Sequence, residues 1–433
     1  MIIRGGTVVT ASGVERTDIA IAGEQITAVG LNLAGAGEEI DASGLHVFPG
    51  GIDSHVHFNE PGRTEWEDIE HGSAALAAGG YTSFIDMPLN NLPVTTDVAS
   101  FDLKLQAMMR SSQVDFGLWG GLVPGNLDQI EPLVKRGVMG FKAFMCPSGI
   151  DEFAASDRRT LHEGMKRIAA LGSILLVHAE DPAHLIQPTW TGALAFIRSR
   201  PPEAEASAIS LASELASETG CRLHIVHVST SSGMDLIREA QLKGLDISGE
   251  TCPHYLLYVA EDLARLGGIA KCAPPFRTAR DREALWTAPM VVSDHSPSTL
   301  DLKRGDDFRH IWGGISGCQS TRQLLLAQNR LDLEAVAAVT ATNIARRFGL
   351  KGKGDIATEF DADLWLVDLS AEGVVRNEDL LYRNPFSAHE GQPIRGRTVR
   401  TLVRGHTAFV NGKAASTPIG RFVRPATGDG PLR

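Results

Sequence analysis

The sequence lacks the features that would bring the protein to nucleic acid or into a membrane. Its formal net charge is -11 and its pI is about 5.7. No basic run is interleaved with aromatic residues, which disfavours a surface that follows phosphates. No uninterrupted apolar stretch reaches the roughly 20 residues that span a bilayer, and residues 1–6 resemble a strand more than a secretory signal. We therefore expect a cytoplasmic protein with no nucleic-acid and no membrane partner.

Cysteine pairs in C-x-x-C spacing are missing as well. The five cysteines are scattered along the chain: Cys146, Cys221, Cys252, Cys272 and Cys318. An odd, scattered set favours reduced thiols over a disulfide framework, and it offers no closed thiol-rich zinc site. What the chain has instead is 433 residues that are 43% hydrophobic and 21% charged, which suits a globular protein with one large domain and a smaller one.

The two ends of the chain share a sequence pattern of short strand-like runs separated by polar turn residues. Residues 7–10, 18–22 and 25–29 show it near the N-terminus, and residues 361–368 and 399–412 show it near the C-terminus. We expect residues 1–49 and 354–433 to form one small β-sandwich domain, with residues 50–353 between them.

The middle portion alternates strand-like apolar runs with helical patterns, as βα units do. One strand ends at His55, after the apolar run 45–52, and seven more runs follow it. They are 82–87, 116–120, 140–145, 174–178, 223–229, 246–251 and 290–295. Eight parallel strands close a TIM (β/α)8 barrel, so we predict the α/β class with a barrel over residues 50–353.

Residues that bind metals stand where these runs end. His55 and His57 lie two apart, so on a strand they share one face, and His178, His227 and Asp294 end three other runs. One such residue alone is more often a hydrogen-bonded core residue than a ligand. Active sites of barrels lie at the C-terminal ends of the strands, and a repeated pattern at four ends predicts a metal site there.

Lys142 is the unusual member, because the run Gly-Phe-Lys-Ala-Phe-Met would bury its ammonium group. An unpaired buried charge is strongly disfavoured. Lys142 could pair with a carboxylate or extend to solvent. A lysine of lowered pKa can also react with CO2 and become an anionic carbamate ligand, and the neighbouring metal-type residues favour that interpretation.

These residues resemble those of the amidohydrolase superfamily, in its cyclic-amidase branch of allantoinases, hydantoinases and dihydroorotases. The resemblance covers nearly the whole chain. It implies a TIM barrel with a small β-sandwich, two divalent ions, usually Zn²⁺ with Co²⁺, Mn²⁺ or Fe²⁺ as alternatives, and an N6-carboxylysine at Lys142. It also implies a homotetramer or homodimer. The implied metal ligands are His55, His57, Lys142, His178, His227 and Asp294.

Residues beside the implied ligands separate the members of the branch. Asn59 stands where dihydroorotases carry an arginine that clamps a substrate carboxylate, and residues 144–149 lack the tyrosine typical of hydantoinases. The segments 55–67, 86–90, 250–256, 271–277 and 312–317 are similar to allantoinases. That resemblance implies substrate contacts from Asn90, Ser316 and Gly317, and less directly from Asn59 and Arg63.

The implied reaction is hydrolysis of the cyclic ureide allantoin to allantoate, a step of purine degradation. Two dications would lower the pKa of a bridging water and polarise the scissile carbonyl. Asp294 would take the proton of the attacking water and return it to the departing ring nitrogen.

Two alternatives stay open: a hydantoinase- or dihydropyrimidinase-like amidase, and a non-catalytic scaffold with the same fold. Two connections, near 181–200 and 286–291, are also shorter than the resemblance leads us to expect. True deletions in these two segments would distort the barrel near Asp294 and reduce activity.

Overall fold

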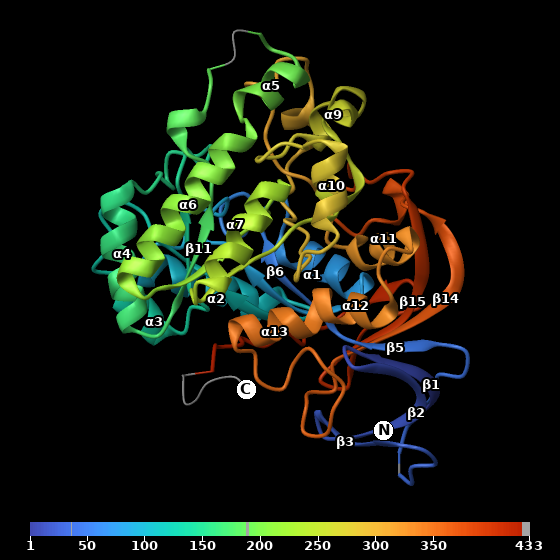
Figure 1. Ribbon diagram of the computed structural model, residues 1–433. Helices are drawn as coiled ribbons and strands as arrows, with labels where there is room; N and C mark the ends of the chain where they lie inside the picture. The colour runs from blue at the N-terminus through green and yellow to red at the C-terminus, as the bar shows by residue number, and fades with distance from the viewer. Residues whose placement is uncertain (36, 188–189, 427–433) are drawn as a thin grey trace.

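The computed structural model describes residues 1–35, 37–187 and 190–426 (Figure 1). Strands from both ends of the chain form one sheet in the order β17-β16-β15-β14-β5-β1-β2-β3, with β4 beside β1. Figure 1 shows the blue N-terminal strands beside the orange and red C-terminal ones. Their bounds are Ile2–Thr10 (β1), Gly13–Ala22 (β2), Gln25–Gly30 (β3), Glu39–Asp41 (β4), His46–Pro49 (β5), Leu364–Val374 (β14), Pro393–Val403 (β15), His406–Val410 (β16) and Lys413–Ala414 (β17).

Alternating side chains give this sheet two cores. Val8, Val47 and Leu364 belong to one buried cluster, whereas their neighbours Phe48 and Trp365 pack with α11 and α12. The sheet therefore faces a core of its own on one side and the barrel helices on the other. The predicted small domain from both termini is confirmed, while its boundaries at 49/50 and 353/354 stay a prediction.

Parallel strands form the barrel. One sheet has the order β6-β7-β8 and the other β13-β12-β11-β10-β9, and β8 and β9 belong to one segment interrupted at Trp119. The bounds are Gly51–Val56 (β6), Tyr81–Asp86 (β7), Asp115–Leu118 (β8), Gly120–Gly121 (β9), Phe141–Phe144 (β10), Ile174–His178 (β11), Arg222–Ile225 (β12) and Ile247–Gly249 (β13). The predicted barrel is confirmed, and the apolar run at 45–52 is split between β5 and β6.

Residues 290–295 take the eighth place in the barrel, but they are not the regular strand that we expected. They pair with their neighbours through the isolated bridges Thr251–Val291 and Val56–His295. The Val291 N–H is bonded to the Val339 carbonyl instead of to a strand. The helix before this segment, α10 (Ala279–Leu285), ends five residues before Met290, so the connection to the eighth segment is short, as the sequence indicated.

Helices surround the barrel and begin at capped positions. The side chains of Asp68, Asp97, Asp157 and Thr230 accept hydrogen bonds from the first turns of α1, α2, α4 and α7. The helix bounds are Ile69–Ala78 (α1), Val98–Ser111 (α2), Ile130–Arg136 (α3), Arg158–Ala170 (α4), Ala193–Ser199 (α5), Pro202–Thr219 (α6), Ser231–Leu242 (α7), Pro253–Leu257 (α8), Ala260–Leu266 (α9), Thr321–Gln328 (α11), Leu333–Ala337 (α12) and Asn343–Phe348 (α13). Single turns lie at Pro182–His184 (η1), Gly267–Ala270 (η2), Leu300–Lys303 (η3), Ala338–Thr342 (η4) and Asn377–Asp379 (η5).

The C-terminal segment returns to the barrel after β17. Phe116 and Phe422 form an isolated parallel bridge, and the Val423 N–H donates to the Phe116 carbonyl at 2.7 Å. All five cysteines are buried and free, in agreement with the absence of a disulfide framework. Within the described ranges, none of the helices combines the length and the apolar character needed to cross a bilayer.

Candidate active site

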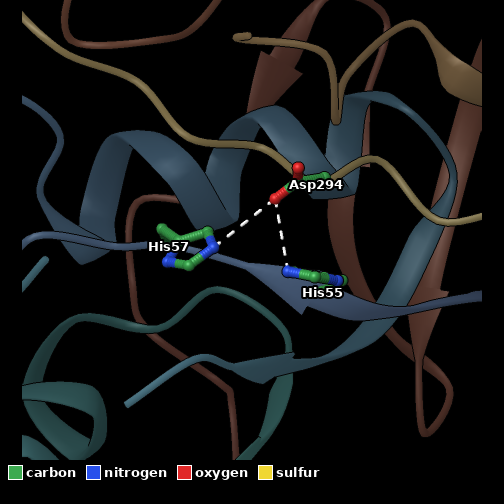
Figure 2. Close-up of side chains that lie close together, drawn as sticks. All are labelled: His55, His57 and Asp294. Atoms are coloured by element: carbon green, nitrogen blue, oxygen red, sulfur yellow. Dashed lines mark ion pairs between the residues drawn. The ribbon is translucent and has the colours of Figure 1, made fainter. Parts of the chain in front are cut away.

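A first group of three side chains meets at the C-terminal end of β6. His55 lies in β6 and His57 directly after it, and both turn a ring nitrogen toward Asp294 (Figure 2). The Nε2 atoms of His55 and His57 lie 3.2 and 3.4 Å from Asp294 Oδ1. Burial alone would raise the pKa of Asp294, but the hydrogen bond from His57 and nearby positive charge hold it below its usual value. Two imidazoles and a carboxylate in this arrangement form a site for a divalent ion.

A second group lies at the ends of β11 and β12. His178 closes β11 and His227 follows β12 by two residues. His178 Nδ1 and His227 Nε2 face each other at 3.0 Å, and the His55 and His227 ring centroids are 5.3 Å apart. His227 and Asp294 both have positive φ, 39° and 47°. Such backbone strain in non-glycine residues is concentrated at functional sites, and here it falls on one residue of each group.

Lys142 lies on β10 and is fully buried. Its Nζ has no hydrogen-bond partner among the described residues. Burial lowers the pKa of Lys142 to about 8, against the opposing charges of Asp294 and Glu250. The charge of Lys142 in turn depresses the pKa values of His55, His178 and His227, although burial of these rings has the larger effect. Its Nζ lies 5.0 Å from the centroid of the Phe144 ring. A buried amine without a hydrogen-bond partner among the described residues fits a residue that is completed by a modification and a metal.

Two buried glutamates, which the sequence analysis missed, hold the far sides of the histidine rings. Glu250 Oε1 lies 2.7 Å from His55 Nδ1, and Glu180 Oε2 lies 2.7 Å from His178 Nε2. Such outer carboxylates fix the ring orientation and tautomer of metal-binding histidines. Glu250 directly follows β13, so the signal that identified the other strand-end residues also applies to it.

The two glutamates differ in charge. Burial raises the pKa of Glu250 to about 8. Burial acts in the same direction on Glu180, but Arg200 forms three hydrogen bonds to that carboxylate and holds the pKa of Glu180 well below its usual range. Glu180 is therefore an anion at neutral pH, stabilised by a guanidinium that no sequence pattern had indicated.

A cavity of about 330 Å³ opens above these residues. Its wall includes His55, His57, His178, His227 and Asp294, together with Asn90. Asn90 has a φ of 77°, and its carbonyl accepts a hydrogen bond from Arg63 Nη1 at 3.3 Å. Arg63 stacks on Trp66 with its guanidinium carbon 4.9 Å from the ring centroid. Asn90 thus faces the space available to a substrate, while Arg63 supports the loop that carries it.

The other residues expected at the substrate lie outside the described lining of the cavity. Asn59 is buried, and its side-chain atoms have no partner among the described residues. The Ser316 carbonyl accepts a hydrogen bond from the Ser387 hydroxyl, and the Gly317 N–H donates to His295 Nδ1 at 3.2 Å. Substrate contacts by Asn59, Arg63, Ser316 and Gly317 stay a prediction.

Known proteins with similar sequences are allantoinases. Residues 46–408 match the model of the amidohydrolase family. The chain is 51% identical to an allantoinase of Rubrobacter xylanophilus, with 98% of this chain and 97% of the relative covered. It is 48% identical to an allantoinase of Solibacter usitatus, with 98% and 96% covered.

Solved structures with the same fold are hydantoinases. The L-hydantoinase (dihydropyrimidinase) of Arthrobacter aurescens superimposes with a TM-score of 0.95 at 31% identity, covering 98% of this chain and 99% of the other. A dihydropyrimidinase of Brevibacillus agri gives a TM-score of 0.90 at 28% identity, with 99% of both chains covered. By family model, sequence and fold together, the chain belongs to the amidohydrolase family and, within it, to the allantoinase group.

Proposed function

We propose that this enzyme hydrolyses the five-membered cyclic ureide of allantoin to allantoate, as a step of purine degradation. Allantoinases that are 48–51% identical over nearly the full chain support this reaction. The observation that carries the proposal is the convergence of two histidine groups on one cavity, together with a buried Lys142 amine that has no hydrogen-bond partner in the described part of the chain.

Two divalent ions would be held by the six residues expected from the sequence. His55, His57 and Asp294 already point ligand atoms at one position. His178 and His227 turn two nitrogens toward each other, and a carboxylated Lys142 would supply the anionic oxygens that this second group lacks. Imidazole and carboxylate ligands suit Zn²⁺ first and Co²⁺, Mn²⁺ or Fe²⁺ as alternatives. When bound, the ions supply Lewis acidity and lower the pKa of a bound water.

The chain's own residues would position the ring and move the proton. Asp294, held as an anion by its contacts with His55 and His57, accepts the proton of the attacking water at Oδ1 or Oδ2 and delivers it to the departing ring nitrogen. Asn90 offers an amide to the polar edge of the ring from the cavity wall. Phe144, whose ring stacks on His178 at 4.4 Å between centroids, keeps that imidazole oriented.

The alternative function is a hydantoinase- or dihydropyrimidinase-like amidase, which the structural neighbours fit. The two functions share metal chemistry and differ in the ring that is cleaved. A homotetramer or homodimer is proposed on the family resemblance alone, and light scattering of the purified protein would establish the number of subunits.

One assay tests the function. Purified enzyme is given allantoin, hydantoin or dihydrouracil before chelation, after chelation and after addition of Zn²⁺, and the ring-opened product of each substrate, allantoate in the case of allantoin, is measured directly. We expect kcat/KM for allantoin to exceed the other two values, and chelation to abolish turnover until the metal is restored. Preference for hydantoin would favour the alternative, and a protein purified without stoichiometric metal and without turnover would be a scaffold.

A further inference from the structure

Two buried lysines outside the metal centre have no carboxylate partner within ion-pair distance among the described residues. Lys271 and Lys303 are 8% and 4% exposed. By contrast, the buried Lys104 and Lys353 each form ion pairs with aspartates. Because a buried ammonium group without a counter-ion is costly, these two lysines call for a structural or functional reason.

Both ammonium groups bind backbone carbonyls of one segment, residues 304–314. Lys271 Nζ donates to the Phe308 and Ile311 carbonyls at 2.5 Å each, and Lys303 Nζ donates to the carbonyls of Trp312 and Gly314. The backbone of Lys271 takes part as well, because its carbonyl accepts the Gly314 N–H at 2.7 Å. Two charges thus hold four carbonyls of a segment that has no regular helix or strand of its own.

This segment is a wall of the substrate cavity. Its residues Arg309, His310, Ile311, Trp312, Gly313 and Gly314 all line the cavity. So do Lys271 itself and Phe196 of α5.

Lys271 also reaches the second part of that wall. Its Nζ lies 4.9 Å from the centroid of the Phe196 ring, and the Phe308 ring centroid lies 6.1 Å from the same ring. The Phe308 N–H donates to the Thr191 carbonyl at 2.7 Å, just before α5. Figure 1 shows α5 beyond the rim of the barrel, with the orange segment that follows α10 passing beside it.

We propose that Lys271 and Lys303 are positioning residues that pin segment 304–314 and α5 together as the closing wall of the substrate cavity. Charge-assisted hydrogen bonds to carbonyls are stronger than neutral ones, which suits a wall that lacks secondary structure. Burial lowers the pKa of Lys271 to about 8 and that of Lys303 to about 7, because no carboxylate of the described residues lies within ion-pair distance to offset the desolvation of either amine. The role in substrate binding rests on the proposed function, whereas the pinning itself does not.

Limited trypsin digestion of the metal-loaded enzyme tests the pinning without any substrate. Arg304 and Arg309 are exposed cleavage positions within the segment. Each variant loses the hydrogen bonds of one lysine to the segment, which then opens locally more often. We therefore expect trypsin to cleave Lys271→Met and Lys303→Met after Arg304 and Arg309 about tenfold faster than the unchanged enzyme. Lys243→Met, at an exposed position after α7, is the matched control and should leave the rate unchanged. Lys271→Gln, which keeps a neutral donor, replaces Lys271→Met if that variant does not fold.

Kinetics and metal content then separate positioning from general damage. We expect Lys271→Met to raise KM for allantoin about tenfold while kcat changes less than threefold and the bound metal stays stoichiometric; Lys271→Arg should restore KM in part. A variant with unchanged proteolysis would overturn the pinning, and faster proteolysis with unchanged KM would overturn the positioning role. If the unchanged enzyme cleaves no allantoin, the proposed function fails and the digestion result still decides the pinning.

Discussion

The two groups of candidate metal ligands are built differently. His55 and His57 already share a carboxylate oxygen of Asp294, so an anion is present in the first group. Among the described residues, no anionic group lies between the facing nitrogens of His178 and His227, and the Lys142 amine has no hydrogen-bond partner. The first group therefore has an anionic ligand from the unmodified chain, whereas in our proposal the second obtains its anionic ligand from a carbamate on Lys142.

The surroundings of the two groups compensate for this difference. Burial raises the pKa of Glu250, behind His55, to about 8, and the negative charge of Asp294 acts in the same direction. Glu180, behind His178, stays charged because Arg200 pairs with it. The group without its own anionic ligand is thus the one supported by a permanent outer anion.

Asp294→Asn should have the largest effect. The amide keeps the shape but loses the charge and the proton acceptor, so we expect turnover of allantoin to fall about 10³–10⁴-fold. Metal analysis should show the loss of one ion while the second group keeps its own. Asp235→Asn, which breaks an exposed pair with Arg238, is the control. Turnover within tenfold of the unchanged enzyme would remove Asp294 from the mechanism.

Lys142→Ala comes next. The variant removes the only proposed anionic ligand of the second group, and we expect a loss of about 10²–10³-fold, similar to removal of one electrostatic group from a preorganised site. Added short-chain carboxylic acids should restore part of the rate, because they can replace the carbamate oxygens. Lys135→Ala, at an exposed ion pair with Glu131, should behave as the unchanged enzyme. Full activity of Lys142→Ala would refute the carbamate.

A matched pair of substitutions compares the outer carboxylates. Glu180→Gln leaves the buried Arg200 without its anion, so we expect the affinity of the second metal ion to fall about 10–100-fold. Glu250→Gln replaces a group whose pKa is raised to about 8, so we expect a smaller loss, confined to the first ion. Competition with a chromophoric chelator measures both constants. If each variant lost affinity equally for both metal ions, Glu180 and Glu250 would not act on separate ligand groups.

The pH dependence of carbamate formation should give the smallest effect. Only the neutral amine reacts with CO2, and burial lowers the pKa of Lys142 to about 8, so its neutral fraction rises with pH through that value. For the metal-free enzyme in bicarbonate, we expect about fivefold more N6-carboxylysine at pH 8 than at pH 7. The carbamate signal in a ¹³C NMR spectrum measures it. A yield that falls over this range would contradict the lowered pKa.

Much of this structure could be predicted because it follows from local sequence patterns, namely apolar runs and the polar residues at their ends. Seven of the eight apolar runs became regular strands, and the polar residues that follow them meet at one end of the barrel, since parallel strands bring their carboxyl ends to one rim. The eighth run did not, because it pairs with Thr251 and Val56 only through isolated bridges. A hydrophobic pattern predicts that such a run is buried, but it does not predict whether the hydrogen bonds to its neighbours are continuous.

Residues that support the site without belonging to the strand-end pattern could not be identified from the sequence. Arg200 and Glu180 lie on either side of η1 and α5, and Lys271 and Lys303 look like ordinary charged positions in the sequence. Their roles depend on carbonyl or carboxylate partners in other segments, and no characteristic sequence spacing relates a residue to a partner of this kind.

The sequence by itself determined the barrel, the terminal sheet and the order of the residues that could bind metal, because apolar periodicity and strand-end chemistry are local properties of the chain. Only the tertiary structure decided that the buried Lys142 amine has no hydrogen-bond partner among the described residues, that the pKa values of Glu180 and Glu250 shift in opposite directions, and that two lysines bind the carbonyls of the cavity wall. The physical reason is that burial, desolvation and long-range hydrogen bonds arise when segments far apart in the sequence come into contact.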